Sequence, residues 1–198
     1  MTGQREFLEQ LVGQLEKCSV AFMVTGSIAS SFHGEPRATR DVDLVIDCSG
    51  DQLAALLEAV QQQGWYVDPA AAMAAHAERA MFNIIDPASG WKADLIVRKT
   101  RDFSLCEFQR RITASVFGPD SIPVKLSTPE DTILSKLEWA GSAASEQQHR
   151  DALAVAILRR RQLDRDYLRR WAEPLGVSDR LERLLEEADE SGPGTWSQ

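Results

Sequence analysis

The sequence is poor in cysteine, since only Cys18, Cys48 and Cys106 occur among its 198 residues. They are odd in number and far apart, and they include no CxxC pair and no histidine at a metal-ligand spacing. This pattern excludes a small secreted scaffold held by disulfides and favours a reducing, cytoplasmic location. A chain of this length can bury enough apolar surface to fold without disulfides or a structural metal.

Long apolar runs are also missing, and none approaches the ~18 residues needed to span a bilayer. The N-terminal residues lack the charged-then-apolar layout of a signal peptide, so we expect no membrane association. The 43% of hydrophobic residues is typical of a globular protein. The net charge of −8 argues against a general nucleic-acid coat protein and remains compatible with a local basic face.

Residues 1–127 have the pattern of a mixed α/β region. We expect helices over 4–17, 28–34 and 52–63, and strands over 19–24, 41–47, 65–68, 81–86 and 91–97. Two further short strands are expected around Gly118-Pro119-Asp120, and Pro87-Ala88-Ser89-Gly90 favours a hairpin between 81–86 and 91–97. The alanine-rich segment 70–80 is left without an assignment.

From Thr128 onward the pattern becomes helical. Pro129 is typical of a first helical position, and helices are expected over 129–140, 146–160, 164–174 and 178–189. The chain is therefore predicted to be of the α/β (α+β) class, with a mixed sheet flanked by helices in residues 1–127. Residues 128–198 are predicted to form a helical C-terminal subdomain with a frayed tail.

Gly26 and Ser27 lie where an apolar strand is expected to turn into a helix. Glycine lets an anion approach the backbone closely, and the N–H groups at a helix N-terminus attract phosphate. Ser27 can equally serve as a simple helix cap, and the Gly-Ser pair alone is a weak signal.

Asp41 and Asp43 are two residues apart on a predicted strand, so their carboxylates project from one face. Such a pair repels itself unless a cation compensates, and Mg²⁺ takes carboxylates together with phosphate oxygens and water. The alternative is an edge strand with an exposed acidic face. Asp94, within Lys92–Val97, adds a third carboxylate to a β-rich apolar run, although a solvated position beside Lys92 is the alternative for it.

The order of these features resembles the polymerase-β-type nucleotidyltransferase superfamily: a strand, Gly-[Gly/Ser], a short gap, Asp-x-[Asp/Glu], and an acidic residue on a later strand. The matching text is MVTGSIASSFHGEPRATRDVDLVID, followed by KADLIV. The segments STPEDTILSKLEW and HRDALAVAIL resemble the helical half of small bacterial members related to abortive-infection toxins. The resemblance covers roughly residues 18–185.

This resemblance implies a nucleotidyltransferase-type fold and Mg²⁺-dependent transfer of a nucleoside monophosphate from an NTP, such as ATP, to an acceptor hydroxyl. It implies that Asp41, Asp43 and Asp94 bind the metal and that Asp94 also acts as general base. Gly26 and Ser27 would hold phosphate oxygens. The chemistry is that of a two-metal displacement, in which positioning contributes most of the protein's share.

Basic residues are candidates for the remaining phosphate contacts. Arg37 and Arg40 lie between the two motifs, and Lys136 follows the helix start at Pro129. For each of them a solvated position is the alternative. The three histidines show no ligand spacing, and we assign none of them to a metal.

The acceptor is left open by the sequence. Toxin-like transfer to tRNA or protein, with a possible cognate antitoxin, follows from the resemblance, and the arginines between residues 149 and 170 favour RNA. A solvated helix face is the alternative for these arginines. The acidic net charge instead favours a cationic antibiotic such as an aminoglycoside or lincosamide. A non-catalytic nucleotide-binding module is a further alternative.

Overall fold

The computed structural model describes residues 3–140 and 145–191, and the tail predicted to be frayed lies outside this range from residue 192 on. The chain forms two compact units. The first, here called the sheet unit, comprises residues 1–28 and 38–127, and the second, the helical unit, comprises residues 29–37 and 128–198. Among the described residues, none of the helices combines the length and the apolar character needed to cross a bilayer.

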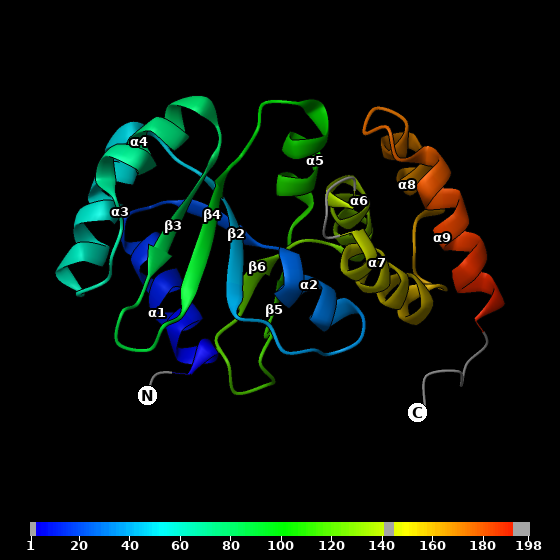
Figure 1. Cartoon of the computed structure of the whole chain (residues 1–198), viewed down its shortest axis with the longest axis horizontal. Coiled ribbons are helices and arrows are strands. Elements are labelled where there is room, and N and C mark those ends of the chain that lie inside the picture. Colours follow the sequence, from blue (N-terminus) through cyan, green and yellow to red (C-terminus); the bar gives the residue numbers. More distant parts are fainter. Residues whose placement is uncertain (1–2, 141–144, 192–198) are drawn as a thin grey trace. The chain divides into compact units, whose positions relative to one another are not determined.

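The sheet unit is built on one six-stranded mixed sheet with the strand order β3-β4-β2-β1-β6-β5 (Figure 1). The strands are β1 (Ala21–Val24), β2 (Asp41–Asp47), β3 (Met81–Ile85), β4 (Lys92–Val97), β5 (Ile112–Ala114) and β6 (Val124–Leu126). The pairs β2–β4 and β1–β6 are parallel, and the other neighbours are antiparallel. The predicted α+β class and the predicted hairpin of residues 81–97 are confirmed.

Alternation along β2 separates an apolar face from a polar one. Val42, Leu44 and Ile46 are completely buried, whereas Asp41 and Asp43 on the opposite face are only partly buried. Because neighbouring side chains on a strand point to opposite faces, the sequence DVDLVID places its carboxylates together and away from the main core. The strand therefore has the bounds and the facing that the sequence predicts.

Helices supply the rest of the sheet unit's core: α1 (Gln4–Lys17), the start of α2 (Gly26–His33), α3 (Gly50–Gln62), α4 (Pro69–Glu78) and α5 (Asp102–Arg110). Helices α1 and α3 contribute buried leucines to the core and pack against each other, and α1 also packs against β1. On the carboxylate-bearing side, Phe108 of α5 packs against Met23 and Val45. That side of the sheet is therefore partly covered.

In this unit one prediction needs correction and two helices were not predicted. The strand expected over 65–68 is wrong except at Tyr66, which forms an isolated bridge with Ile85. The chain cannot continue as a strand there, because Asp68 accepts a hydrogen bond from the Ala71 N–H (3.0 Å) and Pro69 begins α4. The alanine-rich segment is thus a helix, and α5 is a helix that the sequence analysis did not predict.

The helical unit contains the end of α2 with α6 (Pro129–Trp139), α7 (Ser145–Arg159), α8 (Arg165–Ala172) and α9 (Ser178–Glu190). These four helices match the predicted ones to within a few residues at each end. Helix α6 starts sharply because Thr128 caps it, with its Oγ1 accepting from the Asp131 N–H at 3.2 Å. Gly34 is required for packing, since a Cβ there would lie 2.8 Å from the Val155 backbone nitrogen.

Candidate functional site

The turn from β1 into α2 brings the backbone directly against Asp43. Gly26 has φ +58°, and a Cβ at this position would lie 2.6 Å from Asp43 Cγ and 2.7 Å from its Cβ. The Ser27 N–H points at Asp43 Oδ2 over 3.5 Å, and Thr25 N–H donates to the Asp43 carbonyl at 2.9 Å. The N-terminus of α2 therefore faces the carboxylate, where its partial positive charge stabilises an anion. Only glycine fits this approach.

Asp43 and Asp94 lie directly beside each other on adjacent parallel strands. They are register partners in the β2–β4 ladder, and Asp41 is in the same way the partner of Lys92. Since partners in a parallel ladder point to the same face, the structure places Asp41, Asp43 and Asp94 on one face of the sheet unit. Asp94 does share this face with Lys92, and its side chain is only 13% exposed, so it does not have the fully solvated position that was the alternative for it.

Lys92 lies among these carboxylates. Its Nζ is 3.1 Å from Asp94 Oδ1 and 3.2 Å from Asp94 Oδ2, and it is 3.5 Å from Asp41 Oδ1. Although burial lowers the pKa of Lys92, the contacts with Asp94 and Asp41 outweigh it and hold that pKa above its usual value. The carboxylates on this face of the sheet therefore already bind one cation, the ammonium group of Lys92.

Asn83 is a contact of Asp94 that the sequence analysis missed. Its side-chain amide donates to Asp94 Oδ1 from β3, where Asn83 is the antiparallel register partner of Asp94. The signal was present in the alternation of Met81–Ile85, which puts Asn83 on the face opposite Phe82 and Ile84. Such an amide fixes the orientation of the carboxylate, as the outer contacts of metal ligands do.

The donor chemistry of this face suits a hard divalent cation. Among the described residues no group of three or more His, Cys, Asp or Glu side chains is already arranged to hold a metal ion. Mg²⁺ is ordinarily held by only one or two carboxylates, with phosphate oxygens and water completing its shell. Asp43 and Asp94 supply such a pair, and Asp43 is only partly buried. The residues present therefore fit the ion.

The basic residues predicted for phosphate are distributed over both units. In the sheet unit Arg40 is exposed. In the helical unit, Arg37 and Lys136 both bind Asp151: Arg37 Nε and Nη2 approach its two oxygens at 2.9 and 2.8 Å, and Lys136 Nζ lies 2.8 Å from Oδ2. Lys136 is 5% exposed, so the solvated-helix alternative for it is wrong.

Asp151 is the second residue that the sequence analysis missed. Burial by itself would raise its pKa, but hydrogen bonds from Arg37, Lys136 and Gln147 lower that pKa to about 2. A signal existed in HRDALAVAIL, where Asp151 shares the buried side of α7 with alanine and valine residues. A carboxylate in such a position requires a cationic partner, and Lys136 of α6 is about equally buried.

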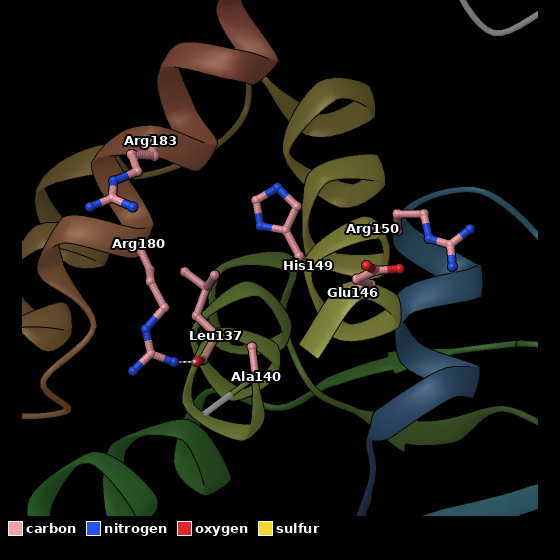
Figure 2. Close-up of a pocket in the computed structure, with 7 residues that line it drawn as sticks. All are labelled: Leu137, Ala140, Glu146, His149, Arg150, Arg180 and Arg183. Atoms are coloured by element: carbon pink, nitrogen blue, oxygen red, sulfur yellow. Dashed lines mark hydrogen bonds between the residues drawn. The ribbon is translucent and has the colours of Figure 1, made fainter. Parts of the chain in front are cut away.

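A cavity of about 590 Å³ in the helical unit has a different character (Figure 2). Figure 2 shows Arg180 and Arg183 of α9 on one side and His149 and Arg150 of α7 on the other. Arg180 Nη1 donates to the Leu137 carbonyl at 2.7 Å. Among the described residues that line this cavity, none is a predicted site residue.

Several of the arginines considered for RNA binding contact the helical unit's own groups. Arg159 donates to the carbonyls of Phe32 and His33. The other contacts are Arg160 with the Ala188 and Ser191 carbonyls, Arg165 with Asp189, and Arg169 with Glu182. Two of these arginines, Arg165 and Arg169, therefore have their charge compensated by a carboxylate, whereas the carbonyl contacts of Arg159 and Arg160 leave their charge in place.

Comparisons with known proteins identify the fold. No protein-family model matches the chain, and no curated protein sequence matches it significantly. The solution structure of the antibiotic-resistance factor ANT(2'')-Ia aligns with a TM-score of 0.53 at 13% identity, over 94% of this chain and 95% of that one. The crystal structure of ANT(2'')-Ia with adenylyl-2''-tobramycin gives 0.53 and 13%, over 94% and 97%.

An antigenic nucleotidyltransferase-like protein from Paracoccidioides brasiliensis aligns with a TM-score of 0.50 at 18% identity, over 92% of both chains. Identities this low are evidence about architecture and not about activity. The predicted fold class is confirmed by these alignments, and the chain has the nucleotidyltransferase fold, with a mixed six-stranded sheet flanked by helices.

Proposed function

We propose that this protein is a Mg²⁺-dependent nucleotidyltransferase, which moves a nucleoside monophosphate from an NTP to an acceptor hydroxyl. The observation that carries the proposal is the adjacency of Asp43 and Asp94 on one sheet face, with Gly26 held against Asp43. The nucleotidyltransferase fold supports it. A non-catalytic nucleotide-binding module would have no need for two carboxylates in register beside a glycine turn.

The proposed roles follow from position. Asp41, Asp43 and Asp94 would hold the metal, which supplies positive charge to the attacking and leaving oxygens. The acceptor oxygen attacks the α-phosphorus. The bond between this phosphorus and the oxygen that bridges it to the β-phosphorus breaks, and pyrophosphate leaves. Asp94 accepts the proton of the acceptor hydroxyl on a carboxylate oxygen, while Asn83 orients that carboxylate. Gly26 and Ser27 offer backbone to the phosphates.

The phosphate contacts proposed for Arg37, Arg40 and Lys136 stay predictions. The charge of a triphosphate supports them. Beside the carboxylates of the sheet face, Lys92 is the ammonium described above, and a triphosphate carries more negative charge than one ammonium can balance. Asp151 is proposed to keep Arg37 and Lys136 extended and close together, because it binds both.

Two classes of acceptor are proposed. Transfer to tRNA or protein, with an antitoxin partner, rests on the resemblance to abortive-infection toxins. Transfer to a cationic small molecule such as an aminoglycoside is favoured by the similar fold of ANT(2'')-Ia, whose complex holds adenylyl-2''-tobramycin, and by the net charge of −8. The pairing of Arg165 and Arg169 on α8 with carboxylates weakens the argument for RNA.

The test is a transfer assay with each labelled NTP, Mg²⁺, and in separate reactions total tRNA, total protein and a panel of aminoglycosides. Asp43→Asn should reduce transfer at least ~10²-fold, the scale of losing a major electrostatic stabiliser, while its melting temperature stays equal or rises. Asp47→Asn is the matched control, because Asp47 lies on the same face of β2 but pairs with Arg98.

We expect Asp47→Asn to retain transfer. Unfolding of the Asp43→Asn variant, or transfer equal to wild type, would show that Asp43 is structural and that the metal mechanism is wrong. Transfer to one acceptor class alone decides between the two proposed classes.

A further inference from the structure

Lys92 contacts two of the carboxylates that the proposed function assigns to a divalent ion. Its Nζ contacts both oxygens of Asp94, at 3.1 and 3.2 Å, and one oxygen of Asp41 at 3.5 Å. We infer that Lys92 is a built-in counter-cation that competes with the metal for Asp94 and so makes metal binding dependent on the nucleotide. This inference rests on the proposed function.

The competition follows from the backbone register. Lys92 is the ladder partner of Asp41 and lies two residues before Asp94 on β4, so its stem starts on the same face as all three carboxylates. The Asp94 side chain is only 13% exposed, and Asn83 already donates to Oδ1. A metal ion at Asp94 must therefore use an oxygen that the ammonium now contacts.

Charge explains why the chain carries this lysine. Three carboxylates on one face repel each other, and Lys92 neutralises one of the three negative charges while the ion is away. A divalent ion arriving alone has to displace the ammonium and leave it near a second cation. A triphosphate arriving with the ion offers the ammonium another anionic partner, so the displacement becomes favourable.

The test measures Mn²⁺ binding by electron paramagnetic resonance, with and without a non-hydrolysable NTP analogue. Without nucleotide, Lys92→Gln should bind Mn²⁺ about tenfold more tightly than wild type, because one partly screened cation has been removed from a site for cations. Lys92→Arg keeps the charge and should behave as wild type. Lys125→Gln is the second control, because Lys125 lies on β6 and its Nζ contacts the Thr113 hydroxyl at 2.9 Å.

The same variants give a second measurement that does not depend on catalysis. Metal-free Lys92→Gln should melt below wild type, since its carboxylates lose their counter-charge, and Mn²⁺ should restore more of its melting temperature than it adds to wild type. An equal Mn²⁺ affinity in wild type and Lys92→Gln would overturn the inference, since Lys92 would then be a structural ion-pair residue only.

The two proposals fail differently. If wild type binds Mn²⁺ with the nucleotide and Lys92→Gln gains nothing without it, only the role of Lys92 is wrong. If no variant binds Mn²⁺ under either condition, the metal-dependent function itself is wrong and the inference falls with it.

Discussion

The absence of a side chain at residue 26 allows the start of α2 to approach Asp43. Two conditions act together there: the backbone is in the left-handed region, with φ +58°, and the carboxyl carbon of Asp43 fills the space of a Cβ. Gly64 meets only the first condition, with φ +83° and no heavy atom within 4 Å of a Cβ. Comparing substitutions at Gly26 and Gly64 therefore distinguishes the effect of backbone strain from the effect of the contact with Asp43.

We expect Gly26→Ala and Gly64→Ala to share a loss of about 1–2 kcal/mol in the free energy of unfolding, the cost of placing an L-residue in the left-handed region. Gly26→Ala should cost more than this shared loss and displace Asp43, because its Cβ would also lie 2.7 Å from the Asp43 Cβ, which rotation of the side chain cannot move. Urea unfolding measures the first effect. Calorimetric titration with Mg²⁺ and an NTP measures the second, as a loss of affinity in Gly26→Ala alone.

Equal nucleotide affinity in the two glycine variants would contradict this account. The approach of Gly26 to Asp43 would then be a matter of packing, and the position of the Asp43 carboxylate would not control ligand binding.

Within the helical unit, the carboxylate of Asp151 connects three segments of the chain. From α7 it binds Lys136 of α6 and Arg37 of the segment after α2, and it accepts further hydrogen bonds from Gln147 and Ser30. These segments are far apart in sequence, so the ion pairs close long stretches of chain. Removing the carboxylate would leave Lys136 buried without its counter-charge.

We expect Asp151→Asn to lose about 3 kcal/mol of unfolding free energy near neutral pH, the scale of breaking a buried ion pair. The folded-state pKa of about 2 lies below the ordinary value of 3.8. The carboxylate therefore stabilises the fold fully above about pH 4. About 2 kcal/mol of this contribution is lost as the pH falls from there toward 2. Urea unfolding of wild type and Asp151→Asn should show that the difference between their unfolding free energies becomes smaller as the pH falls from 7 to 2.5.

Asp189→Asn is the control for this element, because Asp189 pairs with Arg165 on an exposed surface of α9. Exposed pairs contribute little, so this change should cost less than about 1 kcal/mol at every pH. If the unfolding free energies of wild type and Asp151→Asn differed by the same amount from pH 7 to pH 2.5, the Asp151 carboxylate would not titrate as described.

On the scale of the whole molecule, the proposed function requires that metal and nucleotide bind together. A ligand that binds only the folded state raises its stability by mass action, by about 2.7 kcal/mol at a concentration of 100 Kd. For a chain of this size that corresponds to a rise of roughly 5–10 °C in the melting temperature. Each ligand alone should have little effect, because Lys92 holds Asp94 and the triphosphate lacks a counter-ion.

The measurement is differential scanning fluorimetry with Mg²⁺ alone, with each NTP in EDTA, and with both together. We expect the large rise only with both, and the NTP that gives the largest rise identifies the preferred base. An equal rise with NTP in EDTA would contradict metal dependence and would favour a non-catalytic nucleotide-binding module.

The sequence by itself determined the features that depend on neighbours along the chain. The alternation in Asp41–Asp47 placed the carboxylates on one face, and Thr128 with Pro129 defined the start of α6. Strand alternation and helix caps are local, so these predictions held. The strand predicted over 65–68 was wrong although its signal is also local, since Asp68 caps α4 and thereby ends any strand at this point.

The tertiary structure decided everything that depends on pairing between distant segments. Only the β2–β4 register could place Asp94 beside Asp43 and Lys92 beside Asp41, since a shift of one residue would have turned Asp94 to the other face. The pairing of Lys136 and Arg37 with Asp151 was equally invisible, because each charge has a partner more than ten residues away. Burial makes such partners necessary, but the sequence does not identify them, because which charges meet is set by how strands and helices pack.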